Sequence, residues 1–244
     1  MSPMKASVKA KTAYDEERLK SGIPGLDEMI EGGFVKDSTV VLHGRSGAGK
    51  TLFCLQYLYT GATEYDEPGV YMSFSEPESA IHRHARRFGW DMRGLIKKKR
   101  LAILRYQPHE IVKIVEEGGS IIGDTIQAMG AKRLVIDSLT AYEMLFEHSY
   151  KANESVLALF ELLRRWQTTV LVTSETSVSP HLDTESRLGF LTDGIINLYY
   201  LRTNSHRSRA IEIVKMRDTV HTDKIKIFGI KKSGLRVYDG ITAD

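Results

Sequence analysis

The segment from Gly44 to Thr51 reads G-R-S-G-A-G-K-T and fits G-x-x-x-x-G-K-[ST], the pattern of loops that bind nucleoside triphosphates. Its glycines let the backbone turn tightly and approach phosphate oxygens without a Cβ in the way. Successive N–H groups then point into one concavity, and the following helix adds the positive end of its dipole. We expect Lys50 to reach the β- and γ-phosphates and the Thr51 hydroxyl to ligate Mg²⁺. The residues predicted to contact the nucleotide here are Gly44, Arg45, Ser46, Gly47, Ala48, Gly49, Lys50, Thr51 and Leu52.

The residues on either side of this loop favour the same interpretation. Residues 38–43 (S-T-V-V-L-H) are β-branched and apolar, as in a buried strand, and residues 52–59 (L-F-C-L-Q-Y-L-Y) suit a largely buried helix. The alternative is a chance glycine-rich turn, which would not require these flanks or a Lys-Thr ending. The sequence therefore predicts a phosphate-binding loop between a strand and a helix.

A Mg²⁺–nucleotide site also needs a carboxylate at the end of a neighbouring strand. The stretch 133–138 (R-L-V-I-D-S) is an apolar strand pattern that reaches Asp137. We expect Asp137 to hold the water shell of the metal. The alternative is a capping or turn role, because Ser138 could start a helix.

Two further acidic residues follow predicted strands. Glu76 stands just past residues 69–74 (G-V-Y-M-S-F), and Glu175 follows residues 169–174 (T-V-L-V-T-S). Parallel sheets place ligands beyond the carboxyl ends of their strands, so Glu76 is a candidate to orient or deprotonate the attacking water. Glu175 and the polar end of its strand could bond to the γ-phosphate. For each carboxylate a structural role at the following helix or turn stays open.

Strand and helix patterns alternate along most of the chain. Alternation of this kind predicts a mainly parallel sheet with helices on both faces. After about residue 194 strand patterns follow one another without helices, which indicates an antiparallel extension. Residues 21–33 have apolar spacing typical of one helical face, ended by two glycines. The predicted strands are 38–43, 69–74, 101–105, 133–137, 169–174, 194–202, 209–217, 224–230 and 235–238, and the predicted helices are 51–64, 77–88, 109–129 and 153–166.

Length and composition set outer limits on the class of protein. The 244 residues suit one α/β domain at 19–244 behind a flexible tail at 1–18. The net charge of +3 does not by itself argue for nucleic acid or an anionic membrane. No apolar run approaches the roughly 18 residues needed to cross a bilayer, and no signal peptide pattern opens the chain. Cys54 is the only cysteine, so we expect a core residue and a cytoplasmic protein.

Taken together, these motifs resemble the KaiC-like ATPases of the RecA superfamily, most closely the single-domain archaeal kind. The resemblance runs from about Arg18 to about Asp239. It is carried by S-G-I-P-G-L-D-E-M-I-E-G-G, G-R-S-G-A-G-K-T, R-L-V-I-D-S-L-T and R-A-I-E-I-V-K-M-R-D-T-V-H. It implies a RecA-like P-loop core that binds ATP with Mg²⁺, and a homo-oligomeric ring, commonly a hexamer, with nucleotide at the subunit interfaces.

The last of these stretches is the most family-specific. In KaiC-like proteins a K-x-R-G-x-x-H segment projects towards the ATP of the neighbouring subunit, and Lys215, Arg217 and His221 keep that spacing. Lys215 and Arg217 are two residues apart, so on a strand they share one face, where two cations would neutralise triphosphate charge. An exposed basic strand face is the structural alternative. The resemblance also implies a role for Arg209 near the nucleotide.

The chain departs from the family pattern at two positions. Family members usually carry a Glu-Glu pair after the second strand, whereas here Ser75 precedes Glu76. Either Glu76 acts as the base, or hydrolysis is slow and the protein is an ATP-gated regulatory module. The glycine of K-x-R-G is Asp218 here, whose carboxylate could tune the cationic pair. One member of this family is a circadian clock protein with a second domain that is phosphorylated. That second domain has no counterpart in this chain, so a clock function is not expected.

Nucleic acid is a weaker candidate partner. The basic run 97–100 and the basic helix 82–87 could contact phosphate backbones, although a solvated loop and helix face is the favoured interpretation. The loop 177–187 follows a strand as DNA-binding loops of RecA relatives do, but it lacks interleaved aromatic and basic residues. A recombination accessory resembling the RadA paralogues is thus a third hypothesis. The histidines suggest no metal site beyond nucleotide-bound Mg²⁺.

Overall fold

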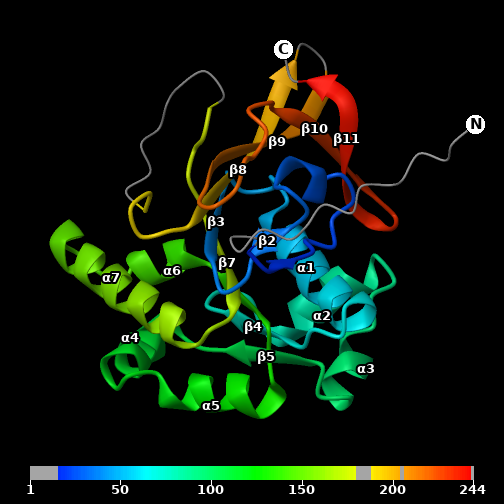
Figure 1. The fold of residues 1–244 in the computed structure, drawn as a ribbon. Helices are drawn as coiled ribbons and strands as arrows, with labels where there is room; N and C mark the ends of the chain where they lie inside the picture. The colour runs from blue at the N-terminus through cyan, green and yellow to red at the C-terminus, as the bar shows by residue number, and fades with distance from the viewer. Residues whose placement is uncertain (1–15, 180–187, 204–205, 243–244) are drawn as a thin grey trace, which may run out of the picture.

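The computed structural model describes residues 16–179, 188–203 and 206–242. Its centre is a nine-stranded sheet in the order β11-β10-β9-β8-β3-β7-β6-β4-β5, and Figure 1 shows the strands stacked through the middle of the molecule. The six strands from β8 to β5 in this order pair parallel with one another. The pairs β8–β9, β9–β10 and β10–β11 are antiparallel. The strands are β3 Thr39–His43, β4 Gly69–Ser73, β5 Leu101–Arg105, β6 Arg133–Asp137, β7 Thr169–Ser174, β8 Gly194–Thr203, β9 His206–Met216, β10 Lys226–Lys231 and β11 Gly234–Thr242. The predicted parallel sheet with an antiparallel extension is confirmed.

Seven α-helices in the described ranges cover the two faces of the parallel part. Helices α1 to α3 lie over one face and α4 to α7 over the other, on the two sides of the sheet in Figure 1. The helices are α1 Lys50–Glu64, α2 Glu78–Arg86, α3 Met92–Lys97, α4 Pro108–Glu116, α5 Ser120–Met129, α6 Leu139–Glu143 and α7 Ser149–Arg165. No helix in the described part of the chain is both long and apolar enough to cross a membrane.

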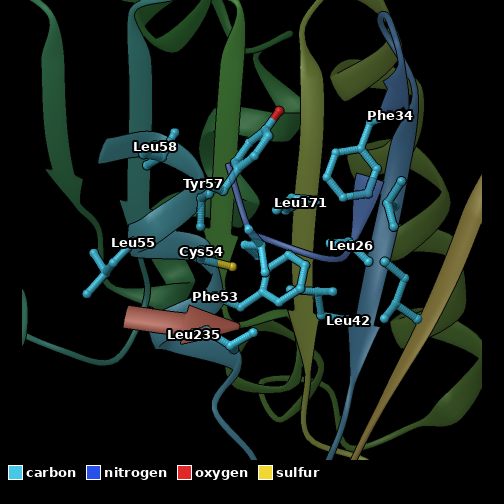
Figure 2. Packing of buried hydrophobic residues seen from close by; sticks show 14 of the residues in the cluster. Leu26, Phe34, Leu42, Phe53, Cys54, Leu55, Tyr57, Leu58, Leu171 and Leu235 are labelled. Carbon is cyan, nitrogen blue, oxygen red and sulfur yellow. The ribbon is translucent and has the colours of Figure 1, made fainter. Parts of the chain in front are cut away.

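The core on the α1 face fixes the helix that follows the glycine loop. Phe53, Cys54, Tyr57 and Leu58 on α1 are fully buried against side chains of β3 and β7, as Figure 2 shows for Leu42 and others. Each buried aliphatic or aromatic side chain contributes about 1.5–3 kcal/mol. The start of α1 is therefore held rigidly beside the end of β3.

Two predicted helices were wrong in detail. Residues 21–33 contain only a 3₁₀ turn at Asp27–Met29, although Ile23 and Leu26 are buried as expected. Gly25 has φ +84°, and a Cβ there would meet the Val237 carbonyl oxygen at 2.4 Å, so this segment is an irregular strap against β11.

The predicted helix 109–129 is two helices. Gly118 and Gly119 between α4 and α5 have φ of +83° and +71°, which end α4 as left-handed glycines do. A Cβ on Gly119 would lie 2.5 Å from Leu162 of α7, so close packing also requires glycine there. The short helices α3 and α6 have no counterpart among the predicted elements.

A short two-stranded sheet joins the start of the domain to its body. β1 (Arg18–Leu19) pairs antiparallel with β2 (Phe34–Val35). Arg18, the last residue of the expected tail, therefore lies in a strand. Residues 1–15 of that tail lie outside the described residues.

A buried arginine ties several elements together at the edge where the parallel strands begin. Arg133 is 0% exposed and forms an ion pair with Glu67. Its guanidinium also donates to the carbonyls of Tyr57 (2.7 Å) and Lys20 (2.8 Å). These contacts connect β6, α1 and the N-terminal strap. A Cβ on Gly61 would lie 2.3 Å from Arg133 Nε, so the guanidinium fills the space that any larger residue on α1 would need.

Candidate nucleotide site

The carboxyl ends of four parallel strands meet around one cavity of about 340 Å³. The glycine loop follows β3, Asp137 ends β6, and Glu76 and Glu175 follow β4 and β7. The structure thus brings together four groups that lie far apart in the sequence. The residues that line the cavity are Ser46, Gly47, Gly49, Lys50, Thr51, Leu52, Ser75, Glu76, His84, Asp137, Ser138 and Glu175.

The backbone of the loop has the conformation that phosphate binding requires. Gly47 and Gly49 have φ of +80° and +113°, a region that glycine adopts without strain. A Cβ on Gly44 would lie 2.7 Å from the Leu198 carbonyl oxygen. All three glycines are therefore needed for the shape of this loop.

Lys50 is folded into the loop. Its Nζ donates to the carbonyl oxygens of Gly44 (2.6 Å) and Arg45 (3.2 Å). Burial lowers the pKa of Lys50, while the carboxylates of Glu175 and Asp137 act in the opposite direction. A lysine in this position would gain from a polyanion within reach, because its charge is only partly compensated by carbonyl groups.

Asp137 is held by three hydroxyl groups. Thr51 Oγ1 (2.8 Å) and Tyr71 Oη (2.6 Å) donate to Oδ2, and Thr173 Oγ1 (2.6 Å) donates to Oδ1. Thr51 and Asp137 are the predicted metal-side pair, and they are in direct contact. Tyr71 was not among the predicted site residues. Its position two residues before Ser73, on the same face of β4, was the available signal.

Glu76 is fixed through its backbone beside the cavity. Ser73 Oγ donates to the Glu76 carbonyl (2.7 Å) and accepts from its N–H (3.1 Å). The carboxylate oxygen Oε2 lies 3.8 Å from His84 Nε2. Glu175 is placed across the cavity, where its N–H donates to Thr140 Oγ1 at 2.7 Å. Both predicted residues line the cavity together with the loop.

Arg209 reaches the loop of its own chain. Its Nη2 donates to the Gly47 carbonyl at 3.3 Å, and its guanidinium lies 4.6 Å from the centre of the Tyr200 ring. β9 brings Arg209 there because it pairs with β8, whose neighbour β3 leads into the loop. Tyr200 had no signal in the sequence.

Lys215 and Arg217 lie level with the start of β3, whereas the glycine loop follows the end of β3. Lys215 Nζ donates to the carbonyls of Gly189 (2.5 Å) and Thr192 (2.6 Å), and Arg217 forms an ion pair with Asp193 (3.2 Å). Burial, followed by the charge of Arg217, lowers the pKa of Lys215. Both side chains contact the segment before β8, although β9 ends at Met216 and Arg217 follows it.

The strand register shows how far Arg217 lies from the glycine loop of its own chain. The Arg217 N–H donates to the Asp193 carbonyl (2.8 Å), and the Asp193 N–H donates to the Thr39 carbonyl (2.9 Å). Thr39 lies five residues before Gly44, which is about 16 Å along a strand. Arg217 cannot span that distance within one chain.

His221 also lies away from the cavity. It is half-buried after β9, with Nδ1 3.0 Å from the Thr222 carbonyl oxygen. Thr222 N–H in turn donates to the Met29 carbonyl (3.0 Å). The predicted site residues therefore form two groups, one around the chain's own loop and one away from it. Of the loop considered for DNA, residues 180–187 lie outside the described residues.

Comparison with known proteins gives the family. The family model described as "ATPase: KaiC" matches residues 19–241. The chain belongs to the KaiC-like ATPase family.

Two relatives and one solved structure show the extent of the likeness. The UPF0273 protein MJ1359 of Methanocaldococcus jannaschii is 31% identical over 235 residues, covering 91% of this chain and 96% of that protein. The circadian clock oscillator protein KaiC of Prochlorococcus marinus is 31% identical over 91% of this chain but 46% of its own length, so the chain spans about half of that relative. The crystal structure of KaiC-like protein PH0186 from Pyrococcus horikoshii has a TM-score of 0.81 and 36% identity, covering 91% of this chain and 99% of that one.

The structure explains one departure of this KaiC-like chain from the family pattern. Asp218, in place of the glycine of K-x-R-G, has φ +53°, a left-handed backbone that glycine adopts freely and that Asp tolerates. Its carbonyl accepts from Arg18 Nη2 at 2.7 Å. The glycine of the KaiC-like motif is thus accounted for by backbone conformation.

Proposed function

We propose that this KaiC-like chain binds ATP with Mg²⁺ and hydrolyses it, in a homo-oligomeric ring where each site is completed by the next copy. The observation that carries the proposal is the cavity in which the glycine loop, Lys50 and the Thr51–Asp137 pair converge. Its glycine-rich backbone and its lysine suit a polyphosphate.

The residues present fit a divalent cation as well as a phosphate chain. Thr51 would ligate Mg²⁺ through its hydroxyl and Asp137 would act through a water molecule, since both offer the oxygen ligands that this ion prefers. Bound there, Mg²⁺ would neutralise charge on the β- and γ-phosphate oxygens. The hydroxyls of Tyr71 and Thr173 orient the Asp137 carboxylate for this role.

Glu76 is the residue we assign to the attacking water. As the water oxygen bonds to the γ-phosphorus, the bond from that phosphorus to the ADP oxygen breaks, and the Glu76 carboxylate accepts the proton that the water loses. Lys50 stabilises the charge that develops on the phosphate oxygens. Glu175 lies across the cavity, where it can bond to the γ-phosphate or its water.

Lys215, Arg217 and His221 are proposed to act on the site of a neighbouring copy. Their distance from the chain's own loop supports this role, because Arg217 lies about five residues of strand away from it. Cations supplied by a neighbour would stabilise transition-state charge as arginine fingers do. The family resemblance suggests six copies, and the single buried Cys54 is compatible with the cytoplasm.

The first test is turnover with and without Lys50. We expect Lys50→Ala to lower kcat/KM for ATP by at least about 100-fold, since it removes a donor to the transferring group. The assay is phosphate release, run beside the molecular mass in solution with and without ATP and Mg²⁺. Unchanged turnover in the Lys50 variant would refute the assigned site.

The second test separates sites completed by a neighbour from sites completed within one chain. Lys50→Ala and Arg217→Ala chains should each be inactive on their own. In a random equal mixture, a site is complete when a copy with intact Lys50 lies next to a copy with intact Arg217. About a quarter of the sites meet this condition, so mixing should restore about a quarter of the wild-type rate. No recovery on mixing, with both chains in one assembly, would refute completion by a neighbour.

A second candidate function is an ATP-gated regulatory module with little turnover. Ser75 favours it, because the usual Glu-Glu pair is incomplete. Tight ATP binding with barely measurable phosphate release would identify the module, whereas turnover of about 1 per second or faster would identify the enzyme.

A further inference from the structure

One oxygen of the candidate base is buried without a hydrogen bond. Glu76 Oε2 is inaccessible to solvent and accepts no hydrogen bond within the described residues. The side chain as a whole is 40% exposed, so its accessible surface lies on other atoms. Buried carboxylate oxygens are normally hydrogen-bonded, and this one has a potential donor nearby, His84 Nε2 at 3.8 Å.

Helix α2 turns His84 towards the cavity. His82, two residues earlier on the same helix, is 7% exposed and is engaged with Glu78 Oε1 at 3.0 Å. Residues two apart on a helix point in nearly opposite directions, so His84 faces away from that buried pair. It is 43% exposed and lines the nucleotide cavity with Glu76.

Lys50 and Asp137, two of the other charged groups of this cavity, already have hydrogen-bond partners. Lys50 donates to two loop carbonyls, Asp137 accepts from three hydroxyls, and Glu175 lies on the far side after β7. Of the basic side chains that line the described cavity, His84 is the one with a nitrogen within 4 Å of Glu76 Oε2.

We propose that His84 is a positioning residue for Glu76 in ATP hydrolysis, a role that rests on the function proposed above. A rotation of the imidazole that shortens the contact by less than about 1 Å would make it a hydrogen bond from Nε2–H to Oε2. Oε1 would then be left to accept the proton of the attacking water. A neutral imidazole donates this bond without placing a permanent charge beside the base, as Lys or Arg would.

This arrangement suits the loss of the first glutamate of the Glu-Glu pair. With Ser75 at that position, Glu76 has no adjacent carboxylate, and its orientation depends on the Ser73 contacts to its backbone and on His84. A base held at one oxygen keeps the other in a fixed direction, which is where positioning contributes to rate.

A matched pair of substitutions tests the role. His84→Leu removes the donor, and His84→Gln keeps an N–H donor of similar reach. We expect the Leu variant to lower kcat about tenfold with KM for ATP changed less than about twofold, and the Gln variant to stay within about threefold of wild type. His109→Leu, at an exposed position on α4, is the control for loss of a histidine. His84→Ala serves in place of the leucine should Leu disturb α2.

A double-mutant cycle distinguishes this role from a structural one. In a Glu76→Gln background, which removes the base, His84→Leu should have no further effect on kcat. An equal loss in that background, or wild-type kcat in His84→Leu, would overturn the inference while leaving hydrolysis intact. Absence of turnover in the unaltered, ATP-bound protein would overturn the proposed hydrolysis and this role together.

Discussion

The stability of this domain should depend on pH through His43, the last residue of β3 before the glycine loop. His43 is 5% exposed, and burial, followed by the charge of Lys50, lowers its pKa from 6.5 to about 4. Between these two values the unfolded chain holds the proton and the folded chain does not. The free energy of unfolding therefore falls as pH is lowered through this interval.

The size of the effect follows from the two pKa values. One pKa unit corresponds to about 1.4 kcal/mol, so the shift of His43 contributes about 3 kcal/mol that is present above pH 6.5 and absent below pH 4. At pH 5 about 2 kcal/mol of it should be gone. The fraction lost at each pH is fixed by the unfolded-state pKa and the folded-state pKa together.

The measurement is urea unfolding of the nucleotide-free protein, followed by tryptophan fluorescence at pH 7.5 and pH 5. Carboxylates also titrate in this range, so the informative quantity is the difference between wild type and His43→Gln in their change with pH. We expect that difference to be about 2 kcal/mol, with the Gln variant less sensitive to pH. His109→Gln, at an exposed histidine, should behave as wild type. Equal pH dependence in wild type and His43→Gln would refute the reasoning.

Three further predictions concern residues outside the reacting groups. Arg133→Met should lower the free energy of unfolding by about 3 kcal/mol, measured in urea, because it leaves Glu67 and two carbonyl groups without their partner. Adding Glu67→Gln should recover part of the loss, and equal stability of the single and double variants would contradict this. Tyr71→Phe should raise the Mg²⁺ concentration for half-maximal ATP hydrolysis about tenfold by freeing Asp137, with Tm little changed, and an unaltered Mg²⁺ titration would exclude that role. Asp218→Gly should raise stability by about 1 kcal/mol by relieving a left-handed backbone, so a lower Tm for the glycine variant would contradict the account.

The sequence was sufficient for the part of the site that local patterns encode. The glycine loop, the strand before it and the helix after it are contiguous. Asp137 ends an apolar strand pattern, and Glu76 and Glu175 each follow one. Parallel sheets bring such ends to one edge, so the cavity was predictable without knowing the strand order.

What could not be predicted depends on contacts between distant segments. The break between α4 and α5 is set partly by Leu162 of α7 against Gly119, and the strap at residues 21–33 is held by β11 rather than by its own helical spacing. The contact of His84 with Glu76 requires α2 to pack with one particular face inward. Apolar spacing alone cannot supply that choice in a helix that also carries four basic or histidine residues near its end.

The separation of Arg209 from Arg217 has a consequence for how many nucleotide sites are complete in an assembly of several copies. Arg209 serves the loop of its own chain, and Arg217 lies level with the start of β3. If Arg217 of each copy completes the pocket of the next copy, an open row always leaves the pocket at one end without an Arg217. The Arg217 at the other end then has no pocket to complete. Only a closed circle gives as many finished pockets as molecules. Catalytic output per molecule would then report directly on closure, rising as the last gap in the circle is filled.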